Sequence, residues 1–301
     1  MKRVFSLLLL MVLFVSSYKA GEEVNFDDVN LFFADKSLLK LSVFMDKLGI
    51  KNTKFGNITF SSDGEKSWYY QNYCQNHYSE DKSLLVFEMA EVPMRWTKVF
   101  AIFEKKDTKY ILKDYIVGNG KYKLSEISFY PSKTNVPVFS ITGNWGGTGT
   151  QTSVITFYQY KNGKANKVLD FTSDKENNTS RISDKYTEKI SYSDAEIRVV
   201  YDIEISSLIG FYESTFKDRP FRIQVFKTTR QNVYKWNPAE QKYIYDTDSS
   251  QLPDKTGSGL SPDAVFYKYF KTEIREVLKN GDKYQREWVE KMFKDIPNQD
   301  R

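Results

Sequence analysis

The stretch Val136–Phe171, VPVFSITGNWGGTGTQTSVITFYQYKNGKANKVLDF, decides the fold class. Two runs rich in β-branched and aromatic residues flank a glycine-rich segment, Gly143–Gly149, and a second turn signal follows at Asn162-Gly163. β-Branched and aromatic side chains favour strands, and Asn-Gly is a strong signal for a two-residue hairpin turn. The stretch therefore predicts consecutive antiparallel strands around a glycine-rich loop.

Strand and turn signals continue on both sides, over residues 52–250. Asp63-Gly64 predicts a hairpin turn, and residues 196–205, EIRVVYDIEI, alternate apolar and polar side chains as a half-buried strand does. Further strands are predicted at 84–92, 97–104, 109–117, 127–130, 136–142, 153–161, 167–171 and 221–228, and a hairpin at 234–245. The polar residues 172–185 are expected to form a long exposed loop.

Helical periodicity appears near the two ends of the chain. Residues 35–48 form an amphipathic pattern before Gly49, and residues 261–280 begin with Ser-Pro-Asp, a typical helix start. A second C-terminal helix is expected from Asp282, and residues 246–260 read as a linker. The predicted fold is mainly β, with antiparallel sheets in a propeller-like or sandwich arrangement, an N-terminal helix and a C-terminal helical pair.

The first twenty residues have the pattern of a targeting segment. Lys2 and Arg3 precede an apolar run over 4–15, which is too short to span a bilayer and is followed by small residues. A signal peptide at 1–20 is expected, with an uncleaved anchor as the alternative. The organisation is then 1–20 signal peptide, 21–51 arm and helix, 52–250 β domain, and 251–301 linker and helices packed on it.

The charge balance and the single cysteine exclude two features, nucleic-acid binding and an intramolecular disulfide. Of the 44 basic residues three lie in 1–20, which leaves 41 against 39 acidic residues, so nucleic-acid binding is not expected. Cys74 is the only cysteine, and an intramolecular disulfide is therefore impossible. The expected protein is soluble, exported by a bacterium to the periplasm or medium, and not stably inserted in a membrane after cleavage.

Two segments resemble a known class of exported proteins. The stretches GNWGGTGTQTSVITFYQYKNGK, over 143–164, and VYKWNPAEQKYI, over 233–244, are similar to strand-turn-strand units of bacterial FG-GAP and VCBS-type β-propeller repeats. The resemblance implies β architecture. Those families often carry an aspartate-rich calcium loop, and this chain has no DxDxDG pattern.

No motif identifies a reaction. His77 is the only histidine and lies three residues from Cys74, the only cysteine. Cys74 lacks the flanking sequence of a cysteine hydrolase. One Cys with one His is too few ligands for a zinc site. Glycan hydrolysis needs only two carboxylates, and Glu88 with Glu91 or Asp202 with Glu204 are candidate pairs. No catalytic residue, metal or cofactor is predicted.

The glycine-rich segment and the aromatic cluster allow two interpretations, a ligand site or a purely structural role, and the structural role is favoured for each. Glycines permit close approach of a ligand, and aromatic rings can stack on sugars. In the structural interpretation these glycines only set a turn and the aromatic side chains are core. The candidate ligand-binding residues are Trp145, Gly146, Gly147, Thr148 and Gln151, with Trp68 and Tyr70 from the densest aromatic cluster. The sequence thus favours a non-enzymatic binding or structural protein of the envelope, whose partner is a glycan or an envelope protein; the alternative is a glycan hydrolase that uses two carboxylates.

Overall fold

The computed structural model describes residues 25–27, 74–90, 97–119, 125–147, 150–178, 182–208, 222–254 and 264–293. The expected signal peptide and the expected helix at 35–48 lie outside these residues, as does the hairpin around Asp63-Gly64. In the part of the chain that is described, strands dominate and all their pairings are antiparallel.

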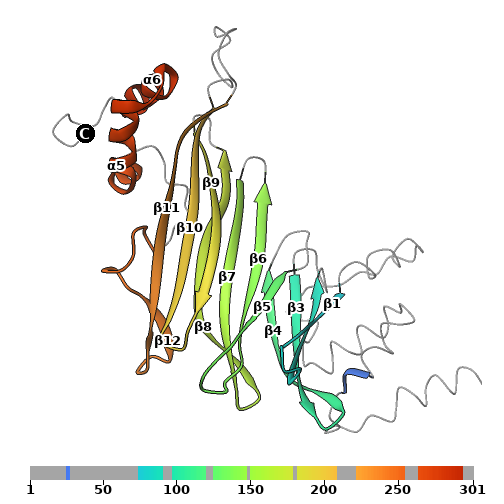
Figure 1. Cartoon of the computed structure of the whole chain (residues 1–301). Helices are drawn as coiled ribbons and strands as arrows, with labels where there is room; N and C mark the ends of the chain where they lie inside the picture. The colour runs from blue at the N-terminus through green and yellow to red at the C-terminus, as the bar shows by residue number, and fades with distance from the viewer. Residues whose placement is uncertain are drawn as a thin grey trace, which may run out of the picture.

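The strands form two sheets, which Figure 1 shows side by side. The four-stranded sheet has the order β1-β2-β3-β4, with bounds Cys74–Tyr78, Leu84–Ala90, Thr97–Lys106 and Lys109–Asn119. The eight-stranded sheet keeps chain order from β5 to β12, with bounds Glu126–Tyr130, Val138–Gly147, Thr150–Lys161, Lys164–Asn178, Ile182–Tyr192, Glu196–Leu208, Arg222–Asn237 and Lys242–Tyr245. Two helices follow, α5 at Ala264–Asn280 and α6 at Lys283–Met292. The expected mainly β class and the C-terminal helical pair are confirmed.

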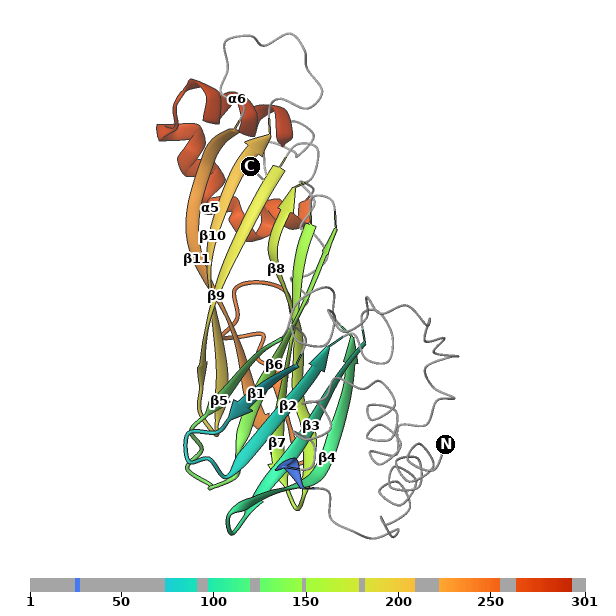
Figure 2. The same ribbon diagram turned by 90° about the vertical axis from the view of Figure 1, so that its right-hand side faces the viewer.

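The eight-stranded sheet turns back on itself between β8 and β9. Among the described residues, these two strands pair only where Glu176–Asn178 meets Ser183–Lys185. Beyond that short ladder the halves β5–β8 and β9–β12 face each other, and the rings of Phe171 and Tyr234 stack between them with centroids 5.5 Å apart. Figure 2 shows the two halves and the four-stranded sheet as successive layers. Of the two expected arrangements, the described residues adopt the sandwich.

The alternation predicted for residues 196–205 produces the inner face of β10. All five apolar side chains at alternate positions are buried in the core between the two halves: Ile197, Val199, Tyr201, Ile203 and Ile205. On the outer face, Lys189 pairs with Asp202 at 2.9 Å and Lys227 with Glu204 at 3.0 Å. A period of two residues with one face buried fixes this register, since a slip of one residue would expose the core side chains.

The four-stranded sheet packs on the opposite face of β5–β8. Its apolar side chains and those of β5–β8 form one buried cluster, built on Leu84, Val86, Phe100, Ile102, Phe139, Ile141 and Tyr160. Hydrogen bonds also join these layers, since the Tyr160 hydroxyl donates to Glu104 at 2.8 Å and the Ala165 N–H donates to Asp114 at 2.8 Å. The layer β5–β8 is therefore covered on both faces.

The helical pair closes one end of the core between the two halves. The Phe270 ring lies 5.6 Å from that of Phe226 on β11, and Arg230 on β11 forms an ion pair with Glu273 of α5. α6 begins where the sequence predicts, because the Asp282 side chain accepts from the N–H groups of Tyr284 and Gln285. Among the described helices, none is long and apolar enough to cross a membrane.

Two loop predictions are wrong. β8 extends to Asn178 and β9 begins at Ile182, so most of the polar stretch 172–185 is strand. The glycine-rich segment continues β6 as far as Gly147, which pairs with Thr150. In both places backbone hydrogen bonding to a neighbouring strand stabilises a strand without requiring apolar side chains.

The beginning of the expected linker is fixed against β11. Leu252 is buried in the core, and its N–H donates to Asn232 at 3.1 Å. The Val233 N–H donates to the Ser250 hydroxyl at 2.9 Å. Residues 246–254 are therefore packed on the layer β9–β12 and do not form a flexible linker.

Candidate functional site

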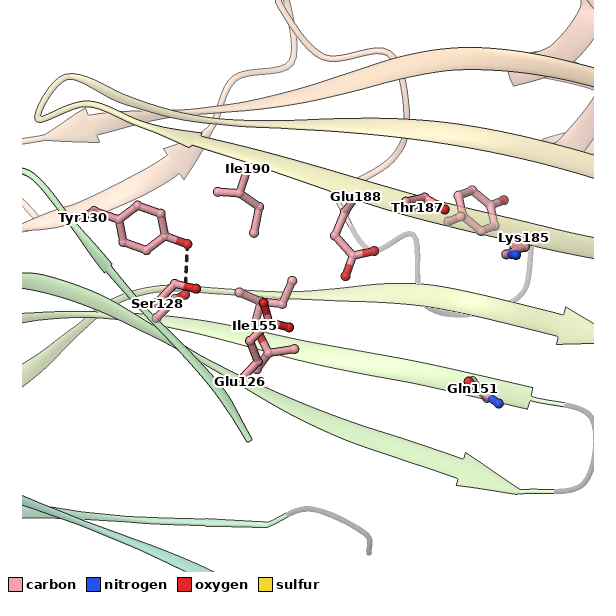
Figure 3. A pocket seen from close by; sticks show the side chains of 12 residues that line it. Glu126, Ser128, Tyr130, Gln151, Ile155, Lys185, Thr187, Glu188 and Ile190 are labelled. Carbon is pink, nitrogen blue, oxygen red and sulfur yellow. Dashed lines mark hydrogen bonds between the residues drawn. The ribbon is translucent and has the colours of Figure 1, made fainter. Parts of the chain in front are cut away.

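A polar cleft of about 650 Å³ opens between the strands β5–β7 and strand β9. Figure 3 shows its side chains projecting from both sides into the space between these strands. We refer to this space as the β5–β9 cleft. It is lined by Glu126, Ser128, Tyr130, Ser140, Thr142, Gln151, Ile155, Lys185, Tyr186, Thr187, Glu188 and Ile190.

The cleft exists because the sheet is not closed at this side. β5 is the last strand of its half, and beyond Lys185 strand β9 pairs only with β10 among the described residues. The two strands therefore border a seam where no backbone ladder joins the halves. Such a seam leaves room for a ligand between two otherwise packed layers.

Strand alternation supplies the polar lining. On β5, Ile127 and Phe129 pack against the four-stranded sheet, while Ser128 and Tyr130 line the cleft. The paired strand β6 contributes Ser140, which is 2% exposed. The floor of the cleft is thus built from hydroxyl groups on strands whose opposite face is core.

Tyr130 closes one end of the cleft. Its hydroxyl is 3.0 Å from the Ser140 hydroxyl, and its ring lies 5.2 Å from that of Phe157 and 5.5 Å from that of Tyr192. Burial raises the pKa of the Tyr130 phenol, with a smaller contribution from the negative charge of Glu126, so the group stays protonated. Tyr130 therefore offers a ligand an aromatic ring held by its neighbours and an uncharged hydroxyl group.

Charged groups come from both sides of the cleft. Glu188 extends from β9 toward the opposite strands, where Glu126 lies, and Lys185 and Gln151 lie farther along, away from Tyr130 (Figure 3). Carboxylates accept hydrogen bonds, whereas hydroxyl and amide groups both donate and accept. This set is suited to a polar ligand that carries several hydroxyl or amide groups.

The structure brings one predicted site residue to the cleft, namely Gln151. Trp145 is half-buried on β6, three positions from the cleft-lining Thr142, so strand alternation places it on the other face of the sheet. Gly146 and Gly147 are exposed at the end of β6. The side chains of Thr148, Trp68 and Tyr70 lie outside the described residues.

Most of the cleft was not predicted from the sequence. The alternating pattern of residues 126–130, EISFY, is a local signal that Glu126 and Ser128 share one face of a strand. Nothing local connects that face with Glu188, because the two segments meet only when the sheet turns back on itself.

A buried ionic network lies directly before β5. The Glu88 carboxylate accepts from the Ser125 N–H at 2.7 Å and from the Lys98 ammonium at 3.3 Å, and Lys98 also donates to the Ser125 hydroxyl at 2.9 Å. The second carboxylate oxygen, Oε2, is 3.6 Å from Nε2 of His77. Ser125 immediately precedes Glu126, the first residue of β5, so this network fixes the position of Glu126 at the start of the strand.

The other chemistry that the sequence allowed is not assembled in the described residues. Glu88 is buried in the network, Asp202 and Glu204 pair with lysines on the outer face, and Glu91 lies outside the described residues. In the same part of the chain no three His, Cys, Asp or Glu side chains gather as a metal site requires. Cys74 and His77 both lie in β1, where His77 faces Glu88.

Comparison with known proteins adds no family assignment. No protein-family profile matches the chain, and no curated protein is significantly similar to it. The geometry of the β5–β9 cleft is therefore the basis for the functional argument.

Proposed function

We propose that the protein is an exported, non-enzymatic binding protein of the bacterial envelope and that the β5–β9 cleft holds a glycan. The observation that supports this is the lining of the cleft, in which hydroxyl, amide and carboxylate groups alternate with the apolar side chains of two isoleucines and the ring of Tyr130. Sugars present hydroxyl edges and apolar C–H faces, which this mixture of groups complements.

The size of the cleft agrees with this proposal. Ligand sites are typically concave spaces of about 300–1,000 Å³ with a few fixed polar groups, and the β5–β9 cleft has about 650 Å³. Tyr130 is held by Ser140 and two aromatic rings before any ligand arrives. A wall that is already rigid costs little conformational entropy on binding.

Isothermal titration calorimetry with soluble peptidoglycan fragments tests the binding proposal. Glu188→Gln should weaken binding about tenfold or more, because a charge-assisted hydrogen bond contributes roughly 1.5–3 kcal/mol. Glu240→Gln, the same change in the exposed turn between β11 and β12, is the matched control and should bind as the unchanged protein does. Equal affinities for both variants would contradict a role for the cleft.

A glycan hydrolase is the second candidate, because two carboxylates, Glu126 and Glu188, line one cleft from opposite strands. Two carboxylates on either side of a glycosidic bond are the usual machinery of such enzymes. Release of new reducing ends from the same fragments, abolished by both Glu126→Gln and Glu188→Gln, would establish hydrolysis. Binding without release would retain the non-enzymatic proposal.

Export is proposed from residues 1–20 and is tested separately. Mass spectrometry of the protein recovered from the periplasm or medium of an expressing bacterium should show a first residue between Tyr18 and Gly21. A full-length chain retained in the membrane would contradict export.

A further inference from the structure

A second cavity lies beside the β5–β9 cleft. It has a volume of about 490 Å³ and shares Tyr130 with the cleft. Its walls come from the turn between β1 and β2 and from the segment 131–137 that joins β5 to β6. Tyr130 thus belongs to the lining of both cavities.

The second cavity has a fixed shape. The segment 131–137 is tied to the turn between β9 and β10, because Ser132 and the Lys133 N–H donate to the Asp194 carboxylate at 2.8 and 2.9 Å. Across the cavity, the Asp81 carboxylate accepts from the hydroxyls of Ser79 and Ser83 at 2.7 and 2.9 Å. Both walls are therefore held by side-chain hydrogen bonds within the protein.

The chemistry of the second cavity resembles that of the cleft. Phe129, Tyr130 and Pro137 supply apolar groups, and the exposed side chains of Glu80 and Asn135 supply polar groups. Asn135 has a φ of 56°, a left-handed conformation that asparagine tolerates better than most residues. An apolar wall with polar groups around it again suits the two kinds of surface of a sugar ring.

We propose that the ligand is a linear oligosaccharide that occupies both cavities and passes from one to the other beside Tyr130. This inference rests on the proposed function, since it extends the glycan from the cleft into the neighbouring cavity. A single sugar would fill only one of the two spaces. A chain gains contacts in the second cavity without a second loss of translational freedom, so its affinity should rise with length.

The test is a length series of β-1,4-linked N-acetylglucosamine oligomers and an equivalent glucose series, each measured by calorimetry. In the series that binds, the hexasaccharide should bind at least tenfold more tightly than the disaccharide. Asn135→Gly, which keeps the positive φ and removes the side chain, should weaken the hexasaccharide and leave the disaccharide unchanged. Asn162→Gly makes the same change at a φ of 55° in the turn between β7 and β8, and should alter neither.

The outcomes separate the two proposals. If no oligomer of either series binds, the two-cavity inference is wrong, and if peptidoglycan fragments do not bind either, the glycan-binding function itself is wrong. If disaccharide and hexasaccharide bind equally, or Asn135→Gly leaves the hexasaccharide unaffected, the cleft binds a short glycan and the two-cavity inference is wrong. Length-dependent binding that Asn135→Gly reduces supports both.

Discussion

Glu88 on β2 and Lys98 on β3 form an ion pair whose side chains are 0% and 3% exposed, with Oε1 and Nζ 3.3 Å apart. The two residues are diagonal neighbours on adjacent strands, since Glu88 pairs with Phe100 and Lys98 with Ala90. Both also hold Ser125, the residue before β5. The pair therefore connects the four-stranded sheet to the strand that begins the β5–β9 cleft.

Removing both partners of this pair should cost less than the two single losses added together. Glu88→Gln or Lys98→Met leaves a charge that is buried without its opposite, which typically costs about 3–5 kcal/mol of unfolding free energy. The double variant should lose less than the sum of the two single losses. Urea unfolding of all four proteins measures this, and strictly additive losses would show that the two charges do not interact.

The hydrogen bond from Tyr160 to Glu104 should stabilise the contact between the two sheets. Tyr160→Phe removes a bond to a carboxylate across the layers, and such bonds contribute roughly 1.5–3 kcal/mol. Tyr110→Phe is the matched control, because its hydroxyl donates to the Lys82 carbonyl at an exposed site and its loss should cost within about 0.5 kcal/mol. Chemical denaturation that gives the two variants equal stability would contradict this assignment.

Tyr158 should make the fold sensitive to alkali. Burial, with a smaller effect from the negative charge of Asp170, raises the pKa of Tyr158 from its ordinary value of 10.0 to about 12. The neutral phenol is favoured in the fold, so the associated stability is fully present below pH 10 and is lost as the pH rises to about 12, where the unfolded chain ionises first.

Tyr158→Phe should therefore flatten the fall of the unfolding free energy between pH 10 and pH 12. Urea denaturation at a series of pH values measures the slope, which reports the protons released on unfolding. The variant should release up to about one proton fewer in this window. The ring of Tyr158 stacks on Phe139 at 5.4 Å, and phenylalanine preserves that contact. An unchanged slope would contradict the assignment.

Two glycines with open space around them should respond differently to the same substitution. Gly163, in the Asn162-Gly163 turn, has a φ of 74°, while Gly147 at the end of β6 has no positive φ. No heavy atom lies within 4 Å of an added Cβ at either site, so only the backbone conformation differs. Gly163→Ala should cost about 1–2 kcal/mol and Gly147→Ala much less. Thermal unfolding compares them, and equal losses would argue against a left-handed turn at Gly163.

Short-range patterns in the sequence determined most of the strands, the turns between them and the C-terminal helices. The Asn162-Gly163 turn follows from two adjacent residues that tolerate positive φ, and the α6 start follows from Asp282 three residues before Gln285. The inner face of β10 follows from a period of two in residues 196–205. In each case the physical cause lies within a few residues of chain, so it can be read without the rest of the molecule.

Only the tertiary structure decided where the sheet turns back and which side chains meet there. The strand at 172–178 carries polar residues, and it is held by backbone pairing to β7 that composition does not reveal. Glu126 and Glu188 belong to segments far apart in the chain, and they line one cleft because β8 and β9 pair at one end and separate beyond it. The glycine-rich segment was a prominent feature of the sequence, yet alternation along β6 places Trp145 on the face opposite the cleft. A site formed between strands depends on long-range packing, which local sequence patterns do not encode.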